Sequence, residues 1–118
     1  MTHFHDVIRE LRDPTRELRH AIPETWAGFA SLHEHALAAG TVPAHMKELV
    51  ALAIAVSKQC DGCIAYHARG AATKGATREE LAEILAVTLL MDGGPASVYG
   101  PRAWAAFNEF AAPADGEQ

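Results

Sequence analysis

The sequence has little of what a β-sheet or a membrane-spanning protein requires. β-Branched residues are sparse, and no alternation of apolar and polar residues continues long enough to predict a strand. The longest apolar run, 49–56, is far too short to cross a lipid bilayer. Only two cysteines occur, so any thiol chemistry depends on a single pair. These absences favour a helical protein outside the membrane, with one cysteine site.

Excess basic charge is absent as well. The formal net charge is -5 and the sequence pI is about 5.7, with basic residues scattered among acidic ones. This pattern predicts no nucleic-acid partner. The first residues, MTHFHDVIRELRD, are charged from the start, unlike a secretory signal. We therefore expect a cytoplasmic protein, in which a CxxC pair is more often metal-binding or catalytic than a permanent crosslink.

The chain does contain a succession of helix-forming segments. Its 118 residues suit one domain, 49% of them are apolar, and alanine is the commonest residue. Proline and glycine divide the chain into about six expected helices, at 3–12, 24–39, 44–59, 61–74, 78–91 and 95–110. The sequence thus predicts an all-α, single-domain bundle, with an N-terminal helical segment at 1–22, the main domain at 23–112 and a frayed tail at 113–118.

Three of these segments carry more detailed expectations. The first helix should stop before Pro14, because proline interrupts helix interiors. In the second, Trp26 and Phe29 should face the core. The third opens after Pro43 and holds eight consecutive apolar residues, so it should be buried nearly all round. Thr77 and Glu80 form an expected capping box ahead of the fifth helix.

The cysteines lie in the segment QCDGCIAYHARG, where a helix is expected to begin. Cys60 would precede this helix and Cys63 would lie in its first turn, where free N–H groups and the helix dipole favour a thiolate. At about 100° per residue, Cys60, Cys63 and His67 share one face. His67 could accept or relay the proton of Cys63, and Cys60 is close enough to form a disulfide with Cys63.

Two other interpretations of the pair remain open. A zinc site would need ligands beyond Cys60, Cys63 and His67, and the chain has no second CxxC and no HxxxH. A structural disulfide would close a very small loop and would restrain the unfolded chain little. Redox chemistry is the leading hypothesis. The five histidines 3, 5, 20, 33 and 35 show no constellation in the sequence, and His45 is expected to be exposed.

The segment 23–99 resembles the carboxymuconolactone decarboxylase-like superfamily, specifically its alkylhydroperoxidase D-like branch. The resemblance lies in Glu48, in Cys60 twelve positions later, in CDGCIAYH, and in the downstream GATREELAEIL and MDGGPASVY. CxxC alone is a weak signal, whereas CxxCxxxH with a glutamate at that upstream spacing is specific.

The resemblance implies a role for each of these residues. Cys63 would attack a peroxide, Cys60 would resolve the oxidised sulfur, and His67 and Glu48 would form a proton relay to the thiols. Alkylhydroperoxidase D proteins carry a further histidine between the cysteines, where this chain has Gly62, so one relay element is missing. The superfamily's decarboxylases lack the cysteine pair. Family members are all-helical and form trimers or hexamers.

Glu48 is a candidate functional residue without the resemblance as well, because it is the one acid at the edge of a wholly apolar run. The alternative is an ordinary solvated glutamate paired with Lys47 or Lys58. With the spacing match, we favour the relay.

These observations predict a thiol oxidoreductase that reduces hydroperoxides or exchanges disulfides through Cys63 and Cys60. It would need no bound cofactor and no metal, and electrons would come from an external dithiol donor. Apolar helices in so small a chain further predict a homo-oligomer, and the resemblance implies a homotrimer or homohexamer. The alternative is a non-catalytic, redox-responsive or ligand-binding module, and a lactone decarboxylase is a distant third.

Overall fold

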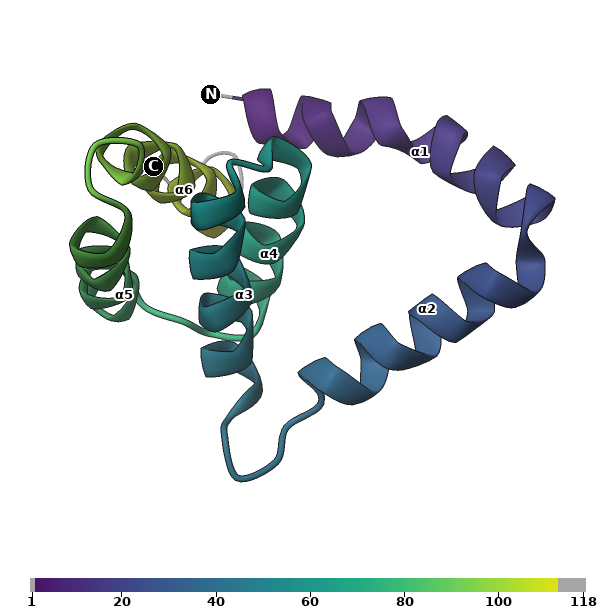
Figure 1. Ribbon diagram of the computed structural model, residues 1–118, viewed down its shortest axis with the longest axis horizontal. Helices are drawn as coiled ribbons and strands as arrows, with labels where there is room; N and C mark the ends of the chain where they lie inside the picture. Colours follow the sequence, from purple (N-terminus) through teal and green to yellow (C-terminus); the bar gives the residue numbers. More distant parts are fainter. Residues whose placement is uncertain (1, 113–118) are drawn as a thin grey trace.

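The computed structural model describes residues 2–112, and the regular structure of this part is entirely helical, as predicted (Figure 1). The expected tail at 113–118 lies outside the described residues. The helices are α1 (His3–Ala21), α2 (Pro23–Leu37), α3 (Ala44–Lys58), α4 (Asp61–Thr73), α5 (Arg78–Asp92) and α6 (Ala96–Ala111). The Thr77–Glu80 capping box is present and fixes the start of α5.

Helices α3 to α6 pack into a body around one hydrophobic core. Its largest fully buried side chains are Phe107, Leu49, Leu52, Ile64, Leu81 and Val56. Where α4 meets α6 the buried residues are mainly alanines, at positions 65, 68, 71, 103 and 106. Small side chains let these two helices approach closely, so the cysteine-bearing helix is held firmly against α6.

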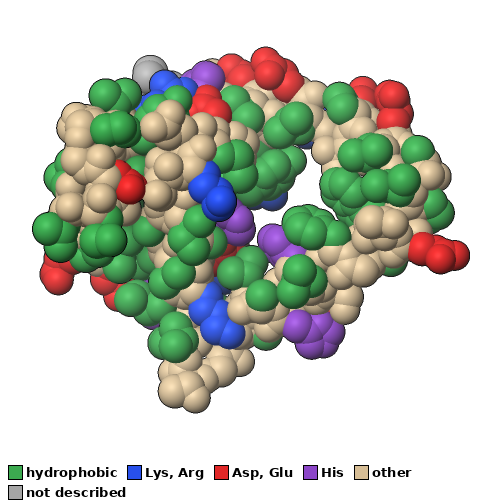
Figure 2. Space-filling model, in the orientation of Figure 1, with side chains coloured by type: hydrophobic (Ala, Val, Ile, Leu, Met, Phe, Trp, Pro, Cys, Tyr) green, Lys and Arg blue, Asp and Glu red, His purple; other side chains and the backbone are tan. Residues whose placement is uncertain are grey.

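Helices α1 and α2 form an arm that extends from the body and bends back at Ile22 (Figure 1). The start of α1 is anchored by Phe4, which is buried in the core. No residue of α2 is buried, and Phe29 is 55% exposed. The expectation that Trp26 and Phe29 pack in the core was therefore wrong for both, since Trp26 is only half-buried and its ring lies against that of Phe29. The space-filling view shows apolar side chains along the arm and an opening between arm and body (Figure 2).

The predicted stop before Pro14 was wrong, because α1 continues through it to Ala21. Proline removes the N–H that would bond to the Glu10 carbonyl. Both Pro14 and Glu10 are exposed, so water can satisfy that carbonyl. An exposed helix thus tolerates a proline that a buried helix would not.

The prediction that α3 is covered on nearly every side was also wrong for this chain by itself. Leu49, Leu52 and Val56 are buried, but Val50 and Ile54 are 49% and 51% exposed. The apolar run therefore supplies one face to the core and a second apolar face to the surface. Among the described residues, no helix is long and apolar enough to cross a membrane.

Candidate thiol and proton-relay site

The cysteine pair lies at the junction of α3 and α4, as the sequence predicted. Gln59 adopts a left-handed conformation and ends α3, so the chain turns directly into Cys60. Cys60 is the N-cap of α4, and its Sγ accepts a hydrogen bond from the Cys63 backbone N–H at 3.2 Å. The two cysteines form a disulfide, with their Cα atoms 5.2 Å apart. Cys63 is exposed and Cys60 is half-buried, so Cys63 is the more accessible sulfur position.

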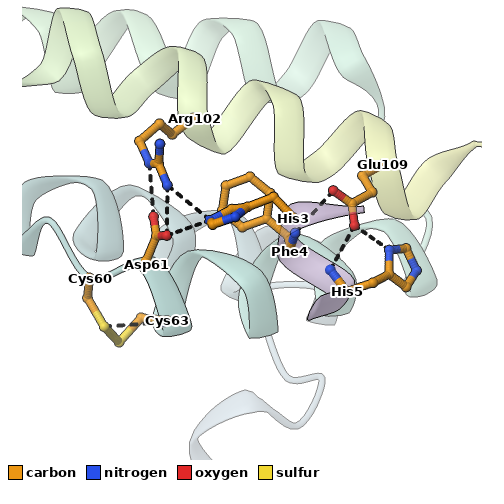
Figure 3. A network of polar contacts seen from close by, with 8 residues as sticks. All are labelled: His3, Phe4, His5, Cys60, Asp61, Cys63, Arg102 and Glu109. Carbon is orange, nitrogen blue, oxygen red and sulfur yellow. Dashed lines mark hydrogen bonds and ion pairs between the residues drawn. A yellow bond between two sulfur atoms is a disulfide. The ribbon is translucent and has the colours of Figure 1, made fainter. Parts of the chain in front are cut away.

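A network of polar contacts holds this turn to α1 and α6 (Figure 3). The guanidinium of Arg102 donates two hydrogen bonds to the Asp61 carboxylate, at 2.9 and 2.7 Å. His3 Nε2 lies 2.8 Å from the same carboxylate. Burial by itself raises the pKa of Asp61, but hydrogen bonds from His3 and Arg102 outweigh it and lower the pKa below its usual value.

The start of α1 is tied to α6 by a second carboxylate. Glu109 accepts hydrogen bonds from the backbone N–H groups of Phe4 and His5 and contacts the His5 ring (Figure 3). The sequence analysis found no constellation around His3 and His5, which was wrong, because their partners lie 58 and 104 positions away. Sequence separation of that kind leaves no local pattern.

Glu48 and His67 meet between α3 and α4. His67 Nδ1 lies 2.8 Å from Glu48 Oε1, and Glu48 is only 4% exposed. An ionised carboxylate can only accept hydrogen bonds, so Nδ1 must carry the proton and Nε2 is left to accept one. Lys74 donates to Glu48 Oε2 at 2.9 Å. The alternative of a solvated Glu48 paired with Lys47 or Lys58 was therefore wrong, and Lys74 is the partner that the sequence analysis missed.

Gly70 makes this close approach possible. A Cβ at position 70 would lie 2.5 Å from the Glu48 carboxylate, which is a clash. A glycine one turn after Tyr66 thus leaves room for a buried acid against the backbone of α4. A Cβ added at Gly62, by contrast, would meet only the Leu11 side chain, at an ordinary contact distance. Steric crowding therefore does not explain why this position lacks a histidine.

The pKa of Glu48 reflects two opposing effects. Burial raises it, whereas the hydrogen bonds from His67 and Lys74 lower it, with the nearby positive charges adding to the lowering. The net direction is downward, so Glu48 is ionised at neutral pH. An ionised Glu48 stabilises a positive charge on His67 when that ring takes up a proton.

His33 belongs to this site, although it stands alone in the sequence. Its ring stacks on that of His67, with ring centroids 6.0 Å apart. Both line a cavity of about 260 Å³ between α2 and α4, together with Glu48, Tyr66, Arg69 and Lys74. The expectation of no constellation was wrong for His33, because α2 is brought to α4 only by the bend at Ile22.

The structure therefore brings Glu48 of α3 to His67 of α4, and joins Cys60, the N-cap of α4, to Cys63 in its first turn. His67 is one turn after Cys63, but among residues 2–112 no hydrogen bond joins its ring to either sulfur. Within the same residues, no group of three or more His, Cys, Asp or Glu side chains could hold a metal ion.

Comparison with known proteins places the chain among relatives. The family model of the carboxymuconolactone decarboxylase family matches residues 23–112. The chain is 41% identical over 101 residues to an uncharacterized protein of Cupriavidus necator, covering 86% of this chain and 89% of that protein. It is 35% identical over 81 residues to uncharacterized protein 4 in the cox locus of Paracoccus denitrificans, covering 69% and 73%.

A solved structure has the same fold as this chain. The apo crystal structure of a carboxymuconolactone decarboxylase family protein from Legionella pneumophila superposes with a TM-score of 0.91 at 38% identity. The match covers 94% of this chain and 99% of that one. The family model and this fold agree, and the chain belongs to the carboxymuconolactone decarboxylase family.

Proposed function

We propose that this protein is a thiol-dependent oxidoreductase of the alkylhydroperoxidase D-like kind, which reduces hydroperoxides through Cys63 and Cys60. The observation that carries the proposal is the buried Glu48–His67 pair one turn from Cys63, in a helix whose start favours thiolates. A structural disulfide would have no use for such a pair.

The proposed first half-reaction consumes the peroxide. The Cys63 thiolate attacks the terminal oxygen of R–OOH, the O–O bond breaks, and the alkoxide takes a proton from His67 to leave as R–OH. Cys63 is then a sulfenic acid. The Cys60 thiol attacks that sulfur, the S–O bond breaks, water leaves, and the disulfide seen in the structure forms.

The second half-reaction restores the thiols. An external dithiol attacks the disulfide, passes through a mixed disulfide and leaves as its own disulfide, so that Cys60 and Cys63 are again reduced. The net change is R–OOH plus dithiol giving R–OH, water and the oxidised donor. No bound cofactor takes part in this cycle, and the cytoplasm would supply reduced dithiols.

The proton relay gives each residue a distinct task. Glu48 fixes the tautomer of His67 and stabilises its charged form, as argued from the 2.8 Å contact. His67 takes the proton of Cys63 before attack and returns it to the leaving alkoxide. Lys74 keeps Glu48 ionised through its 2.9 Å hydrogen bond.

Peroxide consumption with dithiothreitol as donor tests the proposal. We expect many turnovers per chain, loss of turnover in Cys63→Ser, and a sulfenic acid that accumulates in Cys60→Ser. Oxidation of the pair that stops after one equivalent of peroxide would instead support the alternative of a non-catalytic redox-responsive module.

One observation favours that alternative as a second candidate. The Asp61–His3 contact connects the cysteine turn directly to the start of the arm, and Arg102 of α6 contacts both side chains. A change of redox state at Cys60 and Cys63 could be transmitted to α1 by this route. In a sensor, His3→Ala would uncouple the arm from the thiol state, which hydrogen exchange along α1 would detect.

A further inference from the structure

A second cavity adjoins the relay cavity. It has a volume of about 270 Å³ and lies between α1 and α4. Tyr66 and Arg69 line both cavities, so the two share a wall. A molecule held in this second cavity would therefore be separated from the relay cavity by Tyr66 and Arg69.

Four arginines surround this second cavity, and no acidic residue is among the residues that line it. Arg12, Arg16 and Arg19 come from α1 at spacings of four and three, which places them on one helical face. Arg69 approaches from α4, with its guanidinium 5.4 Å from the centre of the Tyr66 ring. Thr15 and Tyr66 add hydroxyl groups to the lining.

Most of this positive charge is not neutralised within the chain. Arg16 pairs with Asp13, on the exposed surface of α1. Within residues 2–112, no carboxylate lies at ion-pair distance from Arg12, Arg19 or Arg69. The whole protein has a net charge of -5, so a cluster of four arginines is unusual on its surface. Mutual repulsion among the guanidinium groups would be relieved by a bound anion.

We propose that this four-arginine pocket binds an anionic group, a carboxylate or a phosphate, on the oxidant that Cys63 reduces. The inference rests on the proposed function and names its substrate class. Arg69 follows Cys63 by six residues on α4, which is roughly 9 Å along the helix axis. Six residues also turn about 240° around the helix, so the substrate would carry its anionic group farther than roughly 9 Å from the peroxide or disulfide that reacts. Planar guanidinium groups suit bidentate binding of such oxyanions.

Binding of inorganic phosphate to the intact protein tests the pocket without any turnover. We expect saturable heat of binding in calorimetry for the wild type, and at least tenfold weaker binding for Arg12→Gln/Arg19→Gln. The matched control is Arg9→Gln/Lys58→Gln, which removes the same charge away from the pocket and should bind like the wild type. Unfolding curves establish that both variants fold. No saturable binding at 10 mM phosphate, or equal loss in both variants, would overturn the proposal.

Kinetics with matched oxidants test the substrate class. With dithiothreitol as donor, kcat/KM is compared for neutral tert-butyl hydroperoxide and for a hydroperoxide of a carboxylic acid. We expect Arg12→Gln/Arg19→Gln to lower the ratio of anionic to neutral kcat/KM at least tenfold, and the control variant to leave this ratio unchanged. If the wild type reduced both peroxides with the same kcat/KM, the proposed substrate class would be wrong, whereas the proposed peroxidase function would stand.

Two further outcomes separate the sources of the anion. Turnover is also compared with anionic dimercaptosuccinate and with neutral dithiothreitol as the donor. If Arg12→Gln/Arg19→Gln lowers kcat/KM only for dimercaptosuccinate, the pocket binds the donor, and our assignment to the oxidant is wrong. Phosphate binding without turnover of any peroxide would reject the proposed function and not the anion pocket.

Discussion

Glu48 illustrates how one buried charge can define a site. Removing a carboxylate from water is costly unless other groups replace the lost hydration. Here His67 and Lys74 each contact one oxygen of the carboxylate. The result is an acid that stays ionised in the interior and holds a neighbouring imidazole in one tautomer, which is the arrangement that general acid–base catalysis requires.

Replacing Glu48 by glutamine should therefore affect both activity and stability. We expect peroxide turnover to fall by about tenfold or more, because the neutral amide no longer stabilises the charged form of His67. Folding stability should fall by about 1–3 kcal/mol, because the Lys74 ammonium loses its charged partner. Stopped-flow peroxide consumption and urea unfolding measure the two effects.

Glu83→Gln is the matched control, since Glu83 is exposed on α5. It should change neither quantity measurably. If Glu48→Gln turned over peroxide at the wild-type rate, Glu48 would have no part in the relay, whatever its contacts.

At the scale of elements, the site depends on how closely α3 approaches α4. Helix surfaces normally keep their backbones apart by the width of the side chains between them. The carboxylate of Glu48 reaches α4 only because Gly70 has no side chain, and Gln59 and Cys60 connect the two helices with a very short turn. Local turn geometry and one glycine together place the acid beside His67.

Gly70→Ala should displace the Glu48 carboxylate, because its Cβ would lie 2.5 Å from that group. We expect turnover to fall toward the level of Glu48→Gln, and stability to fall by about 1–3 kcal/mol from overpacking. Gly100→Ala in α6 is the control, since no atom lies within 4 Å of its added Cβ and helix propensity should rise by about 0.5–1 kcal/mol. Full activity in Gly70→Ala would show that the close contact is dispensable.

At the scale of the whole molecule, the exposed apolar surface requires an explanation. On α2 Phe29 and Leu32 are 55% and 65% exposed, and at the end of α5 Leu90 and Met91 are 81% and 75% exposed. Monomeric proteins rarely leave so many large apolar side chains in water. We propose that further copies of the chain cover these surfaces in a homotrimer or homohexamer.

Light scattering at micromolar concentration should therefore give a multiple of the 12.6 kDa chain mass. Leu32→Glu should lower that mass, because a charge would have to be buried where α2 meets its neighbour. The same result is expected for reduced and oxidised protein. A mass near 12.6 kDa for the wild type would contradict the assembly.

Acid should destabilise the molecule through its paired carboxylates. The pKa values of Glu48, Asp61 and Glu109 lie below their usual range, in each case because hydrogen bonds outweigh the raising effect of burial. The unfolded chain then binds more protons than the folded one, so folding stability decreases as pH falls below about 4.5. Between pH 6 and 3.5, urea unfolding at fixed protein concentration should show a loss on the order of 1 kcal/mol or more. Glu48→Gln should show a smaller loss, and a flat profile in the wild type would contradict this account.

The amino-acid sequence by itself determined the helical class and the ends of several helices, because these depend on local chemistry. Thr77 and Glu80 cap α5 through neighbouring atoms, and the cysteines fall at the start of α4 because a short turn separates two helical segments. The pairing of Glu48 with His67 was a hypothesis that the family resemblance implied, and the 2.8 Å contact is consistent with it.

Only the tertiary structure decided which distant residues complete the site. Lys74, His33 and Arg102 reach their partners through helix packing, and separations of 26 to 41 positions leave no periodic trace in a sequence. The same holds for Val50, Ile54 and Phe29, whose apolar character predicted burial. Hydrophobicity indicates that a surface avoids water, but the arrangement of helices determines whether the same chain covers it.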